Sequence, residues 1–335
     1  MFDLAIILIN YNSSEFTIPC LEKIYEKISP DLSFQVIVVD NCSADEDYQK
    51  VEDYCKSSNF PNLSCSQTHI NCGFGRGNNF GFLKANAHYV AFLNNDTLIL
   101  NDCFSLLIAY LKQHEDVGMV GAQAFKENGD FMVSLDHFAS PTREILGRNF
   151  LELISPVIHP KRKKHHQNPI QVNFVPGSFM LLRSADFEGA GQFDPAIFLY
   201  YEETDLCLRL LKLGKTTFLV PEAQFIHYHG ASTGKSMAIK KEIKISLLYI
   251  LCKHYGNWSM QQVRLFLLYY AKKEEQLNNA MHCLLHKHVV ESLHLHFEQN
   301  DLHHSLTVRR LFAIDHWHKP NATANLQHHQ QCLHC

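Results

Sequence analysis

Runs of apolar residues alternate with polar clusters in the first part of the chain. Leu4–Ile9 and Val36–Val39 are continuous apolar runs, typical of parallel strands buried on both faces, and Tyr89–Leu93 is a further one. Apolar residues recur at helical spacing over 16–28, and a second helix is predicted over 45–56. This alternation predicts an α/β fold with a mostly parallel central sheet flanked by helices.

Polar side chains follow each of these three strands. Asn10 comes after the first strand, Asp40 after the second, and Asn94–Asp96 after the third. Ligands of parallel α/β sheets gather at the carboxyl ends of strands, so we expect one shared site there. An ionised carboxylate is costly to bury alone, so Asp96 is expected to meet solvent, a hydrogen-bond network or a cation. For this stretch alone, a plain strand-to-helix turn is an equal alternative.

A glycine-rich segment lies between a weaker strand predicted over 63–68 and the strand at 89–93. Its glycines predict a tight loop over Asn71–Asn79, where backbone approaches a ligand or another segment, followed by a helix over Phe80–Ala87. The segment does not fit G-x-G-x-x-G, because Asn78 stands where a glycine is required. That mismatch counts against a nicotinamide dehydrogenase.

The middle of the chain is less regular. A capped amphipathic helix is predicted over 101–113, a strand over 118–124, and further strand character over 172–182. Between them, Lys161–His166 is a basic run. Such a run is most often a solvated loop, with anionic lipid or substrate phosphate as alternative partners.

Acidic residues begin the next predicted helix. Glu202–Leu213 has a helical pattern with Glu202, Glu203 and Asp205 in its first turn, where the helix dipole favours carboxylates, and Gly214 is the expected stop. Short strands are predicted over 218–220 and 223–226, and the second runs into His227.

The last hundred residues change character twice. Helices rich in lysine and apolar residues are expected after about residue 235, and a histidine-rich tail after about residue 278. Cys332 and Cys335 have a C-x-x-C spacing without a second half, so a poorly ordered tail is favoured over a metal site.

Composition narrows the class of protein. The chain has 335 residues, 46% of them hydrophobic, and a formal net charge of −4, which does not indicate a dedicated nucleic-acid binder. Its eleven cysteines are scattered, and the N-terminus lacks the pattern of a signal peptide, so a reducing, cytoplasmic compartment is expected. No uninterrupted apolar run is long enough to predict a membrane span, but attachment to a membrane surface stays open.

Taken together, these motifs resemble the inverting glycosyltransferases of family 2, which have the GT-A nucleotide-diphospho-sugar transferase fold, and especially their bacterial rhamnosyltransferase-like branch. The resemblance covers roughly residues 4–235 and depends on the order and spacing of several short motifs. It implies that nucleotide-sugar contacts come from the strand ends and the glycine-rich segment. The residues so implied are Asn10, Tyr11, Asn12, Asp40, Asn41, Asn71, Gly73, Gly75, Gly77, Asn78, Asn79 and Asn95.

The same resemblance implies a metal site. Asn94–Asp96 corresponds to the family's Asp-x-Asp motif, with asparagine in place of the first aspartate, and His227 matches the histidine of the family's His-x-x-Gly-x-Ser. Asp96 and His227 are therefore expected to hold Mg²⁺ or Mn²⁺ against the donor diphosphate, with His229 as the alternative histidine.

The acidic helix start resembles the family's Tyr-x-Glu-Asp-x-Asp-Leu-Cys-x-Arg segment, whose Glu-Asp pair supplies the general base. Glu203 stands at the aspartate position, next to Glu202, and its reach is one methylene longer. Gly177 and Ser178 match a segment that lines the acceptor pocket in the family.

The resemblance implies a catalytic domain over 1–235, and the changes in residue pattern that follow it predict a helical extension over 236–278 and a tail over 279–335. The implied activity is inverting transfer of a sugar, with rhamnose as a candidate, from a nucleotide-diphospho-sugar to a hydroxyl of a glycan or lipid-linked acceptor. Cell-surface polysaccharide or glycolipid synthesis at the cytoplasmic face of the membrane would be its setting. A catalytically weakened sugar- or nucleotide-binding relative is the first alternative. A nucleotidyltransferase is the second, but the chain lacks a Gly-rich, basic N-terminal loop for a triphosphate.

Overall fold

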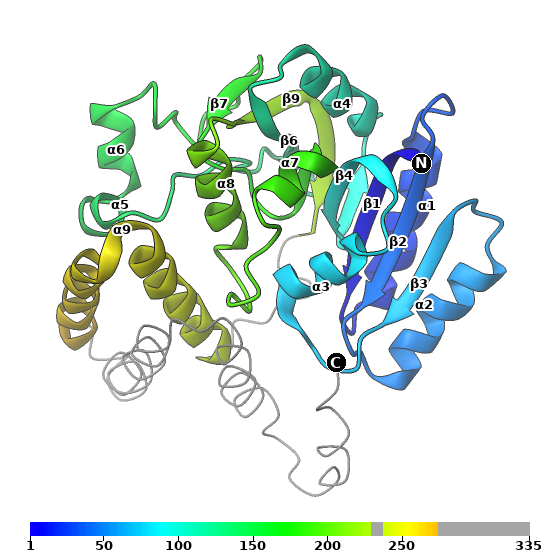
Figure 1. The fold of residues 1–335 in the computed structure, drawn as a ribbon, viewed down its shortest axis with the longest axis horizontal. Helices are drawn as coiled ribbons and strands as arrows, with labels where there is room; N and C mark the ends of the chain where they lie inside the picture. The colour runs from blue at the N-terminus through cyan, green and yellow to red at the C-terminus, as the bar shows by residue number, and fades with distance from the viewer. Residues whose placement is uncertain (229–236, 274–335) are drawn as a thin grey trace, which may run out of the picture.

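The computed structural model describes residues 1–228 and 237–273. Within them the strands form one sheet in the order β3-β2-β1-β4-β8-β6-β9-β5, and β7 also pairs with β9 (Figure 1). The strands are β1 Phe2–Asn10, β2 Phe34–Asp40, β3 Leu63–Gln67, β4 Ala87–Asn94, β5 Thr97–Ile99, β6 Val117–Phe125, β7 Ile170–Val172, β8 Phe179–Arg183 and β9 Thr216–His227. The helices are α1 Ser14–Lys27, α2 Asp45–Ser57, α3 Gly73–Phe82, α4 Cys103–Gln113, α5 Pro141–Leu146, α6 Arg148–Ile154, α7 Ser184–Gly189, α8 Glu202–Lys212 and α9 Met237–Lys273.

The predicted α/β fold is confirmed, and the sheet is mixed. β3, β2, β1 and β4 are parallel neighbours, as are β6 and β9. β8 runs antiparallel between β4 and β6 and joins the two parallel parts. The register places Asn10 directly opposite Asp40, so the polar ends of β1 and β2 meet at one edge.

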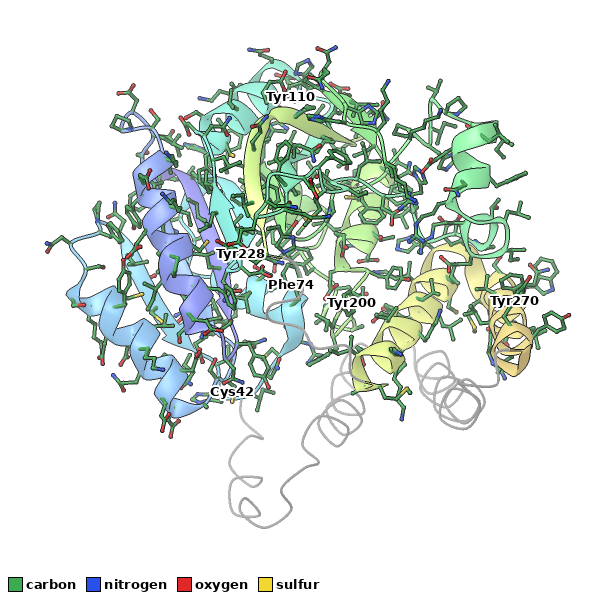
Figure 2. The ribbon with its side chains drawn as sticks, turned by 180° about the vertical axis from the view of Figure 1, so that it is seen from behind. Cys42, Phe74, Tyr110, Tyr200, Tyr228 and Tyr270 are labelled. Atoms are coloured by element: carbon green, nitrogen blue, oxygen red, sulfur yellow. The ribbon has the colours of Figure 1, made fainter. Side chains whose placement is uncertain are left out.

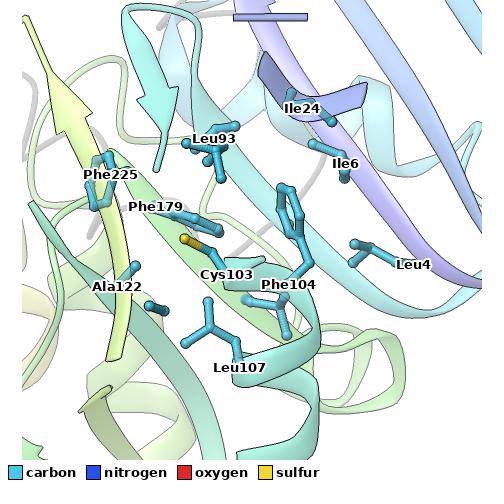
Figure 3. Close-up of a cluster of buried hydrophobic side chains, with 14 of the residues drawn as sticks. Leu4, Ile6, Ile24, Leu93, Cys103, Phe104, Leu107, Ala122, Phe179 and Phe225 are labelled. Carbon is cyan, nitrogen blue, oxygen red and sulfur yellow. The ribbon is translucent and has the colours of Figure 1, made fainter. Parts of the chain in front are cut away.

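Helices cover both faces of the sheet and give it two hydrophobic cores. Leu4 and Ile6 of β1 face a core that also holds Ile24 of α1 and Phe104 of α4, and Figure 3 shows these side chains converging. Ile7 of β1 points to the opposite core, which includes residues of α3, α7 and α8. The alternation along β1 follows from the two-residue period of a strand, so burial on both faces requires a continuous apolar run.

The long helix α9 packs against the start of α8 through a third hydrophobic core. Leu247, Leu248 and Leu251 lie in this core with Ile197 from the segment before α8. Gly256 interrupts the helix with φ 86°, so α9 consists of two helical parts joined at a kink. A helical extension was predicted over 236–278; the part up to Lys273 is helical, and the predicted tail at 279–335 lies outside the described residues.

The predicted loop over Asn71–Asn79 is wrong, as is the helix predicted over Phe80–Ala87. Residues Gly73–Phe82 form α3. The glycines allow the helix to pack closely: a Cβ on Gly81 would lie 2.6 Å from Ile7 Cγ2, and one on Gly75 would lie 3.3 Å from Glu202 Cγ. Glycine lowers helix propensity, but here the missing side chains make room for β1 and α8.

Gly73 provides a test of this packing. Its φ is +80°, and a Cβ there would lie 2.0 Å from the carbonyl oxygen of Phe198, so Gly73→Ala combines backbone strain with a backbone clash. We expect it to lower the free energy of unfolding by about 2–5 kcal/mol in urea titrations. Gly129→Ala is the matched control, because Gly129 has φ +82° but nothing within 4 Å of its Cβ position. Equal losses in both variants would contradict the clash.

Two further expectations change. The strands predicted over 218–220 and 223–226 belong to the single strand β9, which bulges where its register to β6 shifts between Val220 and Gln224. Leu213, the last residue of the predicted helix, follows α8, which ends at Lys212, and its side chain is exposed. None of the helices in the described part of the chain combines the length and apolar character needed to cross a bilayer.

Candidate active site

A buried hydrogen-bond network joins the carboxyl ends of β1 and β2. The amide nitrogen of Asn10 donates to Asp40 Oδ2 at 2.7 Å and to Asp47 Oδ2 at 2.8 Å. The other oxygen of Asp40 accepts from the backbone N–H of Ser43 at 2.9 Å and from Gln67 at 3.1 Å. Asn10 and Asp40 have no exposed surface, so in this conformation they fix the loops around a site.

Asn95 extends this network to the end of β4. Its amide nitrogen donates to Ser13 Oγ and to Thr17 Oγ1, both at 2.7 Å, and Thr17 in turn donates to Asn10 Oδ1 at 2.7 Å. The predicted meeting of the polar strand ends is therefore present. Asp47, Ser13 and Thr17 were not predicted as members, although Ser13, the N-cap of α1, and Thr17 in its first turn are four residues apart and so lie on the same side of the helix.

Tyr11 and Asn12 form the more accessible part of this edge. Asn12 is exposed and has φ 50°, and its side-chain oxygen accepts the N–H of Ala44 at 2.8 Å. Tyr11 is partly exposed. These two residues lie where a bound molecule can contact the loop without displacing the core of the network.

Asn41 fastens the start of α3 to the end of β2. Its amide nitrogen donates to Asn71 Oδ1 at 3.0 Å and to the carbonyl of Gly73 at 3.1 Å, while its oxygen accepts from the N–H of Cys72 at 2.9 Å. The N–H of Gly73 also donates to Asn71 Oδ1 at 2.9 Å. The two asparagines thus hold the N-terminus of α3 beside the strand ends.

The remaining predicted residues of α3 contact protein. Asn79 exchanges two hydrogen bonds with the backbone of Phe193, at 2.8 and 3.1 Å, and Asn78 donates to the carbonyl of Phe74 at 3.0 Å. A Cβ on Gly77 would lie 3.2 Å from Ile9 and 3.7 Å from Asn41. These contacts support the segment before α8, which carries the acidic pair.

Asp96 and His227 lie together, although 131 positions separate them in the sequence. β5 pairs antiparallel with the end of β9 and sets Thr97 opposite His227. The backbone N–H of Tyr228 donates to the Asp96 carbonyl at 3.0 Å, and His227 Nε2 lies 3.1 Å from Asp96 Oδ1 and 3.5 Å from Asn94 Nδ2. The strand pairing therefore brings the two predicted metal ligands side by side.

The surroundings of Asp96 fit a cation. Asp96 is 2% exposed, and its Oδ1 atom has no hydrogen-bond partner of acceptable geometry in the described residues, despite the nearby imidazole. A buried carboxylate oxygen without a donor is costly, and a divalent cation satisfies such an oxygen. No set of three or more His, Cys, Asp or Glu side chains in the described ranges is arranged to hold a metal. Among the described residues, Asp96 and His227 could thus contribute ligands, and His229 lies outside the described residues.

The acidic pair follows two strained residues. Tyr200 and Tyr201 have φ 68° and 72°, a left-handed conformation that is costly for residues with a Cβ, immediately before α8. Burial raises the pKa of the Glu202 carboxyl well above its ordinary value, and the charge of Glu203 adds to this effect. Burial likewise raises the pKa of Glu203, to about 7. Such strain and such shifts concentrate at functional sites.

The two glutamates face different surroundings. Glu202 is buried against α3 at Gly75, and its Oε1 has no hydrogen-bond partner among the described residues. Glu203 is half-buried and lines a cavity of about 270 Å³. Of the pair, Glu203 is thus the one placed to meet a second molecule.

The cavity beside Glu203 contains residues that sequence analysis missed. Asp136, Arg143 and Arg148 line it, together with Tyr200 and Tyr201. Arg148 donates to both oxygens of Asp136 at 2.8 and 3.0 Å, and Arg143 stacks over the Tyr201 ring at 5.8 Å. Asp136, Arg143 and Arg148 come from the irregular region 125–170, where no spacing pattern indicates their role.

A short turn connects this cavity to the Asp96 region. Pro176 lines the cavity, and two residues later the carbonyl of Ser178 accepts the N–H of Asn94 at 3.0 Å. Gly177 lies between them, where a Cβ would contact the Phe74 ring at 3.4 Å. Gly177 and Ser178 thus lie between the acidic cavity and the Asp96–His227 pair.

Ion pairs anchor α8 to α9 below the acidic pair. Asp205 Oδ1 lies 2.6 Å from Lys253 Nζ and 2.8 Å from His254 Nε2, and its Oδ2 accepts from Arg209 at 2.9 Å. Burial opposes ionisation of Asp205, but these donors outweigh it and hold its pKa well below the ordinary value. Asp205 is therefore a structural carboxylate that positions the first turn of α8.

Comparison with known proteins gives a family and a fold. The family model described as "Glycosyl transferase family 2" matches residues 5–189. The mannosyltransferase PcManGT from Pyrobaculum calidifontis, solved in complex with GDP-Man and Mn²⁺, superposes with a TM-score of 0.54 at 14% identity, covering 96% of this chain and 84% of that one. This likeness shows the fold, and the predicted GT-A architecture is confirmed.

Curated relatives are similar over parts of the chain. Rhamnosyltransferase WbbL of Escherichia coli (strain K12) is 28% identical over 204 residues, which cover 54% of this chain and 71% of WbbL. The N-acetylglucosaminyl-diphospho-decaprenol L-rhamnosyltransferase of Mycobacterium tuberculosis (strain ATCC 25618 / H37Rv) is 34% identical over 89 residues. That match covers 26% of this chain and 29% of the mycobacterial protein, so the likeness is to less than a third of that relative.

Proposed function

Because the chain belongs to glycosyl transferase family 2, we propose that it transfers a sugar from a nucleotide-diphospho-sugar to an acceptor hydroxyl with inversion at the anomeric carbon. In this reaction Glu203 takes the proton of the acceptor hydroxyl. The acceptor oxygen then forms a bond to the anomeric carbon from the face opposite the diphosphate. The bond between that carbon and the diphosphate oxygen breaks, and nucleoside diphosphate leaves with the electron pair.

One observation carries this proposal. The Pro176–Ser178 turn separates a half-buried carboxylate in a cavity, Glu203, from a buried carboxylate beside an imidazole, Asp96 and His227. A direct displacement needs a base on the acceptor side and charge stabilisation on the leaving-group side. Glu203, as the base, and the Asp96–His227 pair, as the source of charge stabilisation, lie on either side of this turn, and this arrangement supports the proposed reaction.

Asp96 and His227 would hold Mg²⁺ or Mn²⁺, which supplies Lewis-acid stabilisation of the charge that develops on the leaving diphosphate. Asp96 Oδ1 supports this assignment, because in the described residues it accepts no hydrogen bond of acceptable geometry. The asparagine at the first position of the motif keeps an oxygen donor but removes one negative charge. We expect weaker metal affinity without donor than with it, because the diphosphate brings further oxygen ligands.

The donor nucleotide would lie along the ends of β1, β2 and β4. Asn10, Asp40 and Asn95 hold that edge through buried hydrogen bonds, which leaves Tyr11 and Asn12 as accessible contacts. Asn41 and Asn71 would keep the start of α3 in place beside the nucleotide. Asn78, Asn79 and the glycines of α3 would contribute by fixing the loop before α8.

The base requires an ionised Glu203. Burial raises the pKa of Glu203 to about 7, so the active form is lost as pH falls through that value. We expect kcat/KM to be level above about pH 8 and to fall tenfold for each pH unit well below about 7. A pH–rate profile at saturating metal measures this limb. An acidic limb near the ordinary glutamate pKa of about 4.3 would contradict a shifted base.

A panel of donors tests the function. UDP-, GDP- and dTDP-sugars, each with and without Mn²⁺, are screened by thermal shift, and release of nucleoside diphosphate is measured with glycan and lipid-linked acceptors. A selective donor is expected to raise the melting temperature by mass action. Donor binding without transfer or hydrolysis would favour the catalytically weakened binding relative. Pyrophosphate release from a nucleoside triphosphate would favour the nucleotidyltransferase.

The similarity to two rhamnosyltransferases supports rhamnose as the first sugar to test. We further propose a role in cell-surface polysaccharide or glycolipid synthesis, with the protein at the cytoplasmic face of a membrane. The acceptor would be a glycan or a lipid-linked saccharide, bound in the cavity at Glu203 near Gly177 and Ser178.

A further inference from the structure

One edge of the molecule exposes apolar side chains. α5, α6 and the second half of α9 lie along the same edge in Figures 1 and 2, at the opposite end from β3 and α2. On α6 and just after it, Leu153 is 78% exposed and Val157 89% exposed, with Ile154 and Ile158 also exposed. We call α5, α6, residues 155–158 and the part of α9 after Gly256 the apolar edge.

The second half of α9 is apolar on more than one side. Met260 and Val263 are buried in the core, whereas Trp258, 74% exposed, and Tyr269 and Tyr270 point to solvent. Figure 2 shows Tyr270 at the outer boundary of the molecule. A helix with large apolar side chains on a face that its own core does not cover favours a second apolar neighbour, and Trp and Tyr are the residues enriched at membrane interfaces.

The charges along the apolar edge are positive. Residues 141–170 contain six lysines and arginines, four of them in the basic run, against two carboxylates, Glu144 and Glu152, and residues 256–270 contain Arg264 and no acidic residue. Both carboxylates are paired internally, since Glu144 lies 2.5 Å from Arg143 Nη2 and Glu152 lies 3.1 Å from Arg162 Nε. The lysines at 161, 163 and 164 are exposed. A chain with a formal net charge of −4 thus carries a basic surface at this edge.

We propose that the apolar edge, with Lys161, Lys163 and Lys164, docks the protein on an anionic lipid bilayer. Exposed aliphatic and aromatic side chains enter the interface, and the lysines pair with lipid phosphates. A second protein copy would place like charges opposite each other, which disfavours that occupant. α5, α6 and α9 also contribute Arg143, Arg148 and Ile243 to the cavity at Glu203. Docking would therefore bring the cavity close to lipid-linked acceptors.

Flotation of the full chain with vesicles tests this surface. Binding to phosphatidylglycerol–phosphatidylcholine vesicles is expected at low salt, with release as the ionic strength rises, and little binding to phosphatidylcholine alone. Lys163→Glu with Lys164→Glu is expected to weaken binding at least ~25-fold, since each lysine contributes about a fivefold factor. The same exchange at Lys50 and Lys112, exposed lysines of α2 and α4, is the control and should change binding little.

The apolar contribution is tested separately. Leu153→Asp with Val157→Asp is expected to lower binding at least tenfold, whereas Leu83→Asp, at a residue 77% exposed after α3, leaves it unchanged. The chain has two tryptophans, so Trp317→Phe leaves Trp258 as the reporter. Its emission should shift to shorter wavelength with anionic vesicles and be quenched by brominated lipid.

Three outcomes would overturn the docking surface: no flotation at low salt, a dimer that Leu153→Asp with Val157→Asp converts to monomer, or a Trp258 already shielded from acrylamide without lipid. Donor thermal shifts do not involve this edge. The docking proposal and the proposed reaction therefore fail independently.

Discussion

Glu203→Gln is expected to lower kcat by about 10²–10⁴-fold and to leave donor binding nearly unchanged, because the amide keeps the shape of the side chain but cannot accept the acceptor's proton. Glu203 lines the cavity, and its pKa is already raised by burial, so the carboxylate is suited to proton transfer near neutral pH. Single-turnover transfer with the donor found by thermal shift measures the effect.

Two companion variants separate the base from its neighbour. Glu203→Asp restores the residue type of the family motif and should retain most activity, with an altered pH profile. Glu202→Gln makes the same glutamate-to-glutamine change as Glu203→Gln, but in the neighbouring side chain, which packs on α3 at Gly75. We expect it to leave the acidic limb of the pH profile in place. Full activity of Glu203→Gln would exclude Glu203 as the base, and loss of the acidic limb in Glu202→Gln alone would assign the base to Glu202.

The strand ends could be predicted because their causes are local. A parallel strand covered on both faces must be continuously apolar, and Leu4–Ile9 and Val36–Val39 have that pattern, so the positions of Asn10 and Asp40 follow. The prediction of a loop over Asn71–Asn79 was wrong because the cause of the structure there is not local. Its glycines weaken a helix locally, and the neighbours that require them, Ile9 at Gly77 and Phe198 at Gly73, come from distant parts of the chain.

The residues that surround Glu202 and Glu203 could not be predicted from the sequence either. Asp136 and Arg143 line the Glu203 cavity from some 60 residues away, within a region without periodicity. The left-handed backbone at Tyr200 and Tyr201 is imposed by tertiary packing, in which Tyr201 contacts Arg143 and the α9 core. Motif order predicts where the candidate residues lie along the chain, but the contacts that each of them makes depend on the fold.

Asp96→Asn tests the leaving-group side of the site. Asparagine matches the size of aspartate but removes the charge, so Mn²⁺ should no longer add to the thermal shift given by a nucleoside diphosphate. Loss of electrostatic stabilisation worth several kcal/mol predicts a fall in kcat of about 10²–10³-fold. The fold should persist, because in the part of the chain that the structure describes Asp96 Oδ1 accepts no hydrogen bond of acceptable geometry that the substitution would remove.

His227→Gln gives the matched comparison at the second ligand. His227 Nε2 lies 3.1 Å from Asp96 Oδ1, so both variants should weaken the same Mn²⁺-dependent thermal shift, and the double variant should lose little more than Asp96→Asn alone. If the losses of the Mn²⁺-dependent thermal shift in the two single variants were additive in the double variant, Asp96 and His227 would not bind the same ion. An unchanged Mn²⁺ response in Asp96→Asn would remove Asp96 from the metal site and leave its burial without a functional reason.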